Sequence, residues 1–152
     1  MRINLHLNFD GRCEEAFRSY QSILGGEIRT LLTFGESALA NQVPEAWSKR
    51  ILHATLAWDD QELLGSDAFP GEPVGHQGFS LTLSTADLAR ASRCFEQLAQ
   101  QGAIMLPLQR TFWAQAFGVV VDRFGVTWEI NCSFPEAPVD PNNTNTRTAS
   151  DA

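Results

Sequence analysis

One pattern of apolar residues occurs twice in this chain, in two segments that lie far apart. Each copy has the spacing of one face of a helix, and each follows a stretch in which apolar and polar residues alternate as in a strand. The two stripes are Cys13, Ala16, Phe17, Tyr20, Ile23 and Leu24, and then Leu88, Ala91, Ser92, Phe95, Leu98 and Ala99. Every position of the second stripe lies 75 residues after its counterpart, as Leu88 does after Cys13. We therefore expect an internal duplication of one structural unit.

Each predicted helix is preceded by one strand and followed by three. The alternation of apolar and polar residues predicts strands at about residues 2–9, 27–35, 52–58 and 62–67, and then at about 80–84, 103–110, 116–122 and 126–133. Asp10 and Gly11 are expected to turn the chain and cap the first helix. Both units then have the order βαβββ. Residue identity between them is weak, so the duplication rests on pattern and order.

The segments between and after the units set the expected domain boundaries. Residues 1–68 form the first module and residues 78–134 the second. The linker, residues 69–77, contains several Pro and Gly residues. The tail, residues 135–152, has almost no apolar residues and is expected to be flexible. A long loop, residues 36–49, interrupts the first module, and loops of this length often cover a site.

Composition excludes some partners. The formal net charge of −7 argues against non-specific binding to nucleic acid or to an anionic membrane, because both require clustered Lys and Arg. No apolar run approaches the roughly 20 residues of a membrane span. The three cysteines show no C-x-x-C spacing and fit reduced thiols, so we expect a cytoplasmic protein.

The last two predicted strands form the segment with the strongest functional signal. They meet at a tight turn, residues 122–125, in which Asp can cap the turn and Gly tolerates positive φ. After the turn, apolar residues on one face alternate with Thr127, Glu129 and Asn131 on the other. An acid and an amide within such a strand either face solvent or line a pocket.

These features resemble the vicinal oxygen chelate superfamily, which includes glyoxalase I, bleomycin-resistance proteins and extradiol dioxygenases. Two βαβββ units and a D-x-F-G turn leading into W-x-I-N carry the resemblance, and within the superfamily the chain looks like the PhnB-like branch. The matching segments are residues 7–20, 24–26, 53–56, 63–67 and 111–131. The resemblance implies an α+β fold in which two βαβββ modules form a curled, cup-shaped mixed sheet with helices packed outside. It also implies a ligand cavity inside the cup and a homodimer.

Metal-using members of the superfamily place ligands on the cup face of each module's first and last strands. By resemblance, these positions fall at Asn4 and Ser80 on the first strands. On the last strands they fall near Gly65 or Asp67, and at Glu129. Asn and Ser are poor ligands for transition metals, so no metal site and no other cofactor is favoured.

A displaced metal site remains an alternative. His6 is predicted on the same strand face as Asn4, and Asp67 could supply a second carboxylate beside Glu129. A His–Asp–Glu set resembles a facial triad, which holds a divalent metal with open positions. The protein would then be a metal-dependent lyase, isomerase or dioxygenase, with Glu129 as the candidate catalytic base that moves a proton.

The leading hypothesis is a metal-independent protein that binds a small molecule in the cup. Whether it also catalyses a reaction stays open. No G-x-G-x-x-G turn occurs in the sequence, so methyl transfer from S-adenosylmethionine is not expected. The predicted ligand-binding residues are Asn4, His6, Asn8, Ser80, Thr82, Trp113, Glu129 and Asn131.

Overall fold

The computed structural model describes residues 1–69 and 71–135, so all but the first residue of the predicted tail lies outside the described residues. The first module contains β1 (Leu5–Phe9), α1 (Cys13–Leu24), β2 (Glu27–Thr33), β3 (Ile51–Trp58) and β4 (Gln61–Asp67). The second contains β5 (Leu81–Thr85), α2 (Leu88–Ala99), β6 (Ala103–Gln109), β7 (Ala116–Val121) and β8 (Thr127–Cys132). Two short 3₁₀ helices, η1 (Ala40–Gln42) and η2 (Glu45–Trp47), lie in the long loop of the first module. The predicted βαβββ order is confirmed in both halves.

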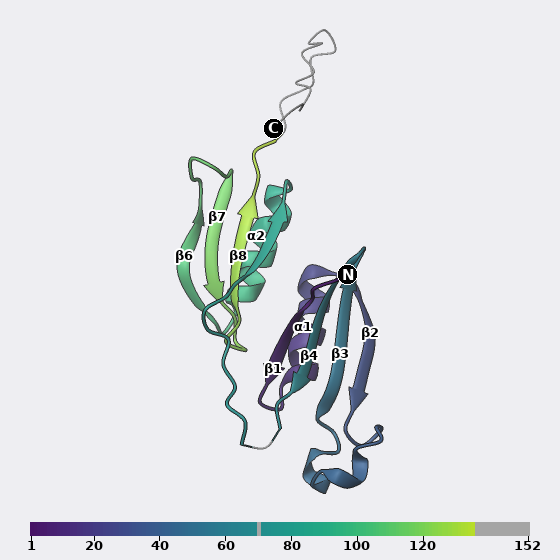
Figure 1. Ribbon diagram of the computed structural model, residues 1–152. Coiled ribbons are helices and arrows are strands. Elements are labelled where there is room, and N and C mark those ends of the chain that lie inside the picture. Colours follow the sequence, from purple (N-terminus) through teal and green to yellow (C-terminus); the bar gives the residue numbers. More distant parts are fainter. Residues whose placement is uncertain (70, 136–152) are drawn as a thin grey trace, which may run out of the picture.

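The strands form two separate four-stranded sheets with matching topology (Figure 1). Their strand orders are β1-β4-β3-β2 and β5-β8-β7-β6. In each sheet the first and last strands of the module pair in parallel, and the other pairs are antiparallel. Neither sheet closes on itself. The predicted α+β fold of two βαβββ modules with mixed strand pairing is therefore confirmed, and the expected cup-shaped sheet consists of two separate sheets of four strands.

Each helix covers one face of its own sheet (Figure 1). The apolar stripes predicted from the sequence form this contact, because Ala16, Phe17 and Tyr20 of α1 and Phe95 of α2 are all buried. A Cβ added at Gly65 of β4 would lie 2.4 Å from Phe17. Only glycine allows the helix to approach the first sheet this closely. No helix in either described range is long and apolar enough to cross a bilayer.

The turn between β7 and β8 joins the two modules. The Asp122 carboxylate is buried, and its Oδ2 accepts hydrogen bonds from the Tyr20 hydroxyl (2.7 Å) and the Trp128 indole N–H (2.9 Å). Its Oδ1 accepts the amides of Phe124 (2.8 Å) and Val126 (3.0 Å). Because Tyr20 belongs to α1, one carboxylate both shapes the turn of the second module and binds it to the first.

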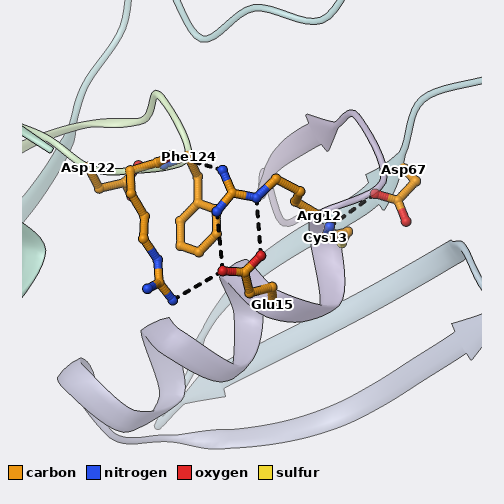
Figure 2. A network of polar contacts seen from close by, with 7 residues as sticks. Arg12, Cys13, Glu15, Asp67, Asp122 and Phe124 are labelled. Atoms are coloured by element: carbon orange, nitrogen blue, oxygen red, sulfur yellow. Dashed lines mark hydrogen bonds and ion pairs between the residues drawn. The ribbon is translucent and has the colours of Figure 1, made fainter. Parts of the chain in front are cut away.

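A second group of contacts surrounds this joint (Figure 2). Arg12 donates to the carbonyl of Arg123 at 3.1 Å, and its guanidinium carbon lies 4.6 Å from the centre of the Phe124 ring. Glu15 pairs with both Arg12 (3.1 Å) and Arg123 (3.4 Å). At the C-terminal end of α1, Arg90 of α2 donates to the carbonyl of Leu24 at 3.0 Å. The two modules are thus held together by buried and half-exposed polar contacts on both helices.

Candidate functional site on the open sheet faces

The sheet faces turned away from the helices carry most of the predicted ligand-binding residues. Strand alternation places side chains two residues apart on the same face. In the second sheet, the parallel register pairs Thr82 with Glu129 and Ser84 with Asn131. In the first sheet, it pairs His6 with Leu64 and Asn8 with Ser66. Each module therefore presents one polar strip, built from its first and last strands.

Glu129 is the centre of the strip on the second sheet. Ser80 donates to its Oε1 at 3.0 Å and Thr82 to its Oε2 at 3.3 Å. The side chain is half-buried, and within residues 1–69 and 71–135 it forms no ion pair. The structure thus brings together three of the predicted residues. The hydroxyl groups of Ser80 and Thr82 donate to the Glu129 carboxylate, which has no cationic partner among the described residues.

An aromatic pair borders this strip. Phe117 pairs with Asn131 in the antiparallel register and shares its face of the sheet. The Trp113 ring lies 5.4 Å from the Phe117 ring at an angle of 63°, and Trp113 is 50% exposed. The predicted residues Trp113 and Asn131 therefore belong to the same surface as Glu129. Phe117 joins them, because the alternation in β7 places it on this face.

The strip on the first sheet is a hydrogen-bonded cluster. His6 Nε2 lies 3.0 Å from Ser66 Oγ, which donates to Asn8 Oδ1 at 3.0 Å. The ring of His53 lies 6.4 Å from that of His6. The pKa of His6 is lowered, first by burial and then by the nearby His53, while its hydrogen bond with Asn8 acts in the opposite direction. His53 and Ser66 were not predicted as site residues, because their roles depend on the pairing of β1 with its neighbours.

Asn4, also predicted, contributes to a different contact. It donates to Glu62 at 3.2 Å, and Glu62 also pairs with Arg29 at 3.2 Å. These three side chains are linked to one another at the start of β4. Asn4 therefore forms its hydrogen bond with the ion pair of Glu62 and Arg29, two residues that were not predicted to belong to the site.

The displaced metal site is not assembled. Asp67 pairs with Phe9 and lies on the core face of the first sheet, whereas His6 lies on the open face. The Asp67 carboxylate is 3% exposed and accepts the amides of Cys13 (3.0 Å, Figure 2) and Ile51 (2.8 Å). Glu129 belongs to the other sheet. In the part of the chain that the structure describes, no three His, Cys, Asp or Glu side chains are placed to hold a metal ion.

The strand register also corrects the assignment of equivalent positions. Glu129 pairs with Thr82, whose counterpart in the first module is His6, and His6 pairs with Leu64. Leu64 is therefore the counterpart of Glu129, in place of Gly65 or Asp67. A shift of one residue moves a side chain to the opposite face of a sheet, which is why the predicted position was wrong. The first module has an apolar residue where the second has its acid.

Comparison with known proteins assigns the chain to a family. A model of the 3-demethylubiquinone-9 3-methyltransferase family matches residues 1–131. The chain belongs to this family. It is similar to protein YjdN of Escherichia coli K12, with 34% identity over 139 residues that cover 86% of this chain and 95% of YjdN.

Two solved structures extend the comparison. Protein PA1353 from Pseudomonas aeruginosa has 40% identity and a TM-score of 0.81, and the match covers 89% of this chain and 99% of PA1353. The PhnB protein from Bacillus cereus has 26% identity and a TM-score of 0.75, with coverage of 88% and 100%. The predicted PhnB-like branch is thereby confirmed. The wider vicinal oxygen chelate grouping stays a prediction.

Proposed function

We propose that this PhnB-like protein binds a small molecule on the open face of its second sheet, with Glu129 as the principal contact. The observation that carries the proposal is the state of the Glu129 carboxylate. Ser80 and Thr82 fix its orientation, while no cation in the described residues neutralises it. A half-buried, oriented carboxylate forms strong hydrogen bonds with a cationic or donor group.

The neighbouring side chains support a ligand that is partly aromatic. Trp113 and Phe117 offer ring faces beside Asn131, whose amide both donates and accepts hydrogen bonds. Ligand sites commonly combine aromatic walls with a few polar groups in this way. The proposed ligand class is therefore a small aromatic molecule with an amine, amidine or guanidine group.

The proposal is one of binding and assigns no metal or other cofactor to the site. Leu64 occupies the position in the first module that corresponds to Glu129, and an aliphatic side chain cannot ligate a metal. Methyl transfer is not proposed, although the family name refers to it. S-adenosylmethionine-dependent transfer commonly uses a glycine-rich turn, and the sequence has no G-x-G-x-x-G.

Replacement of Glu129 by glutamine tests the proposed site. Aromatic amines and guanidines would be screened by thermal shift, and the affinity of each hit would be measured by calorimetry. We expect Glu129→Gln to lower the affinity for each hit by about tenfold or more, because the variant loses a charge-assisted hydrogen bond to the ligand. Glu96→Gln, which changes an exposed acid on α2, is the matched control and should leave binding unchanged. Equal affinity for the wild type and Glu129→Gln, or a screen without hits, would reject the proposal.

We also propose that the protein is a cytoplasmic homodimer. Phe112 is 92% exposed and Met105 is 65% exposed, both in the second module, and the Phe112 ring lies 4.7 Å from that of Trp113. Exposed apolar side chains, such as the adjacent pair Phe112 and Trp113, are typical of surfaces that bind another protein. Sedimentation equilibrium at micromolar concentration should give the mass of a dimer, and Phe112→Ser should shift the equilibrium towards the monomer. A wild-type mass equal to that of one chain would contradict this expectation. For the compartment, the support is that all three cysteines are free and buried.

A further inference from the structure

A cavity of about 660 Å³ lies at one end of the first module, apart from the strip around Glu129. Its lining residues come from the ends of β1 and β4, from the long loop and from the linker. Figure 1 shows where these segments lie in the first module. Trp47, Arg50, Phe69 and His76 line the cavity, together with Phe124 of the second module. Its volume is that of a typical small-molecule site.

The aromatic wall of this cavity is anchored in the core. The rings of Trp47 and Phe69 are nearly parallel, at an angle of 11° with centres 6.5 Å apart. Both contact Phe34 edge-on, at 5.6 Å and 5.4 Å, and Phe34 is 1% exposed. The long loop and the linker are therefore joined through one buried ring. The two outer rings, Trp47 and Phe69, line the cavity.

Arg50 supplies a positive charge beside this wall. Its guanidinium carbon lies 4.2 Å from the centre of the Trp47 ring. Of its five N–H groups, one reaches an acceptor among the described residues, at 3.4 Å from Asp10, whose side chain is 86% exposed. An exposed contact of this length is weak and easily replaced. Arg12, in contrast, is already bound to Glu15 and to the carbonyl of Arg123. Arg50 is the guanidinium that can take a new anion.

His76 supplies a polar atom without a partner. The residue is 9% exposed, and its ring lies 5.2 Å from Phe9 and 6.3 Å from Phe79. Its Nε2 is buried, and none of the described residues forms a hydrogen bond with it. Buried polar atoms without a partner are rare in native proteins and call for an explanation. A hydrogen bond with a bound molecule would provide it.

We propose that this cavity is a second binding site and that it takes a small aromatic carboxylate. The aromatic ring packs on Trp47 and Phe69, the carboxylate pairs with Arg50, and a second polar group meets His76 Nε2. A monoanion fits better than a phosphate dianion, because Asp10 and Glu72 also line the cavity and only one guanidinium is available. This ligand is opposite in charge to the one proposed for Glu129.

The experiment is a titration of the full-length ¹⁵N-labelled protein with benzoate, followed by ¹H–¹⁵N NMR. We expect saturable shifts at the Trp47 indole and at the amides of residues 47–50, 68, 69, 71, 72 and 74–76. Benzyl alcohol, which lacks the charge, and acetate, which lacks the ring, should bind much more weakly. Shifts that cluster around Glu129 would overturn the proposal. So would a titration that shows no saturation up to about 10 mM benzoate.

Variants identify the groups responsible. Arg50→Gln should lower the affinity for benzoate by about tenfold or more, because it removes a charged hydrogen-bond donor. The matched control Arg29→Gln, on β2, should bind benzoate as the wild type does, and so should Glu129→Gln, which separates this site from the other one. Unchanged affinity in Arg50→Gln would overturn the proposal. If the NMR spectrum of free Arg50→Gln shows loss of fold, Arg50→Lys is used, and the same criterion applies with a smaller expected loss.

Discussion

Replacing Asp122 by alanine is expected to lower the free energy of unfolding by about 3–5 kcal/mol. The change leaves four donors without their acceptor, and two of these, the Tyr20 hydroxyl and the Trp128 indole, are side chains of buried residues. Since small domains have a total stability of about 5–15 kcal/mol, this is a large fraction. Urea denaturation followed by tryptophan fluorescence measures the loss. A decrease below about 1 kcal/mol would show that the joint between the modules is unimportant for stability.

Two further variants divide the effect of Asp122 between its two oxygens. Asn in this position can keep the oxygen that accepts the turn amides, but it places an N–H₂ group opposite the Trp128 indole, which only donates. Asp122→Asn should therefore lose less stability than Asp122→Ala. Tyr20→Phe should lose about 1.5–3 kcal/mol, the contribution of one hydrogen bond to a charged acceptor. Burial, reinforced by Asp122, raises the pKa of Tyr20, so its hydroxyl remains a donor at neutral pH.

Replacing Asp67 by alanine is expected to cost about 2–4 kcal/mol. Asp67 accepts the first amide of α1, from Cys13, and the first amide of β3, from Ile51. Without the carboxylate, both amides are buried and unpaired, and α1 loses the negative charge at its N-terminus. Urea denaturation measures the overall loss, and hydrogen exchange at the amides of Cys13 and Ile51 should become faster.

The matched control for Asp67 is Asp59→Asn. Asp59 lies in the exposed turn between β3 and β4 at φ 49°, a conformation that Asn accepts well. This variant should stay within about 0.5 kcal/mol of the wild type. If Asp67→Ala and Asp59→Asn had equal stability, the structural role of Asp67 would be refuted.

The sequence predicts the fold well because the signals involved are local. The spacing of the two apolar stripes gives both helices, which run from Cys13 and Leu88 as expected. The alternation in the last strand places Glu129 and Asn131 on the open face, and the parallel register places Thr82 opposite Glu129 and Ser84 opposite Asn131. These residues come together because the same parallel pairing occurs in both modules.

The parts that the sequence does not predict depend on contacts between distant segments. Asp10 was expected to cap α1, but its side chain is 86% exposed and forms no bond with the helix. Asp67 takes this role across 54 residues, and its face is set by the register of β4 against β1. Likewise, Asp122 is predictable as a turn residue, whereas its bond to Tyr20 spans 102 residues. No local pattern reveals either contact.

The joint at Asp122 also shows that the two modules are no longer interchangeable. In a perfect duplication, the turn between β3 and β4 would meet α2 as the turn between β7 and β8 meets α1. The counterpart of Tyr20 on α2 is Phe95, which has no hydroxyl, and Asp59 of the first turn lies in solvent. Among the described residues, this polar joint therefore occurs once, and the chain lacks the internal symmetry that its sequence repeat suggests. Each copy has become specialised, one as the bearer of the tyrosine and the other as the bearer of the acid.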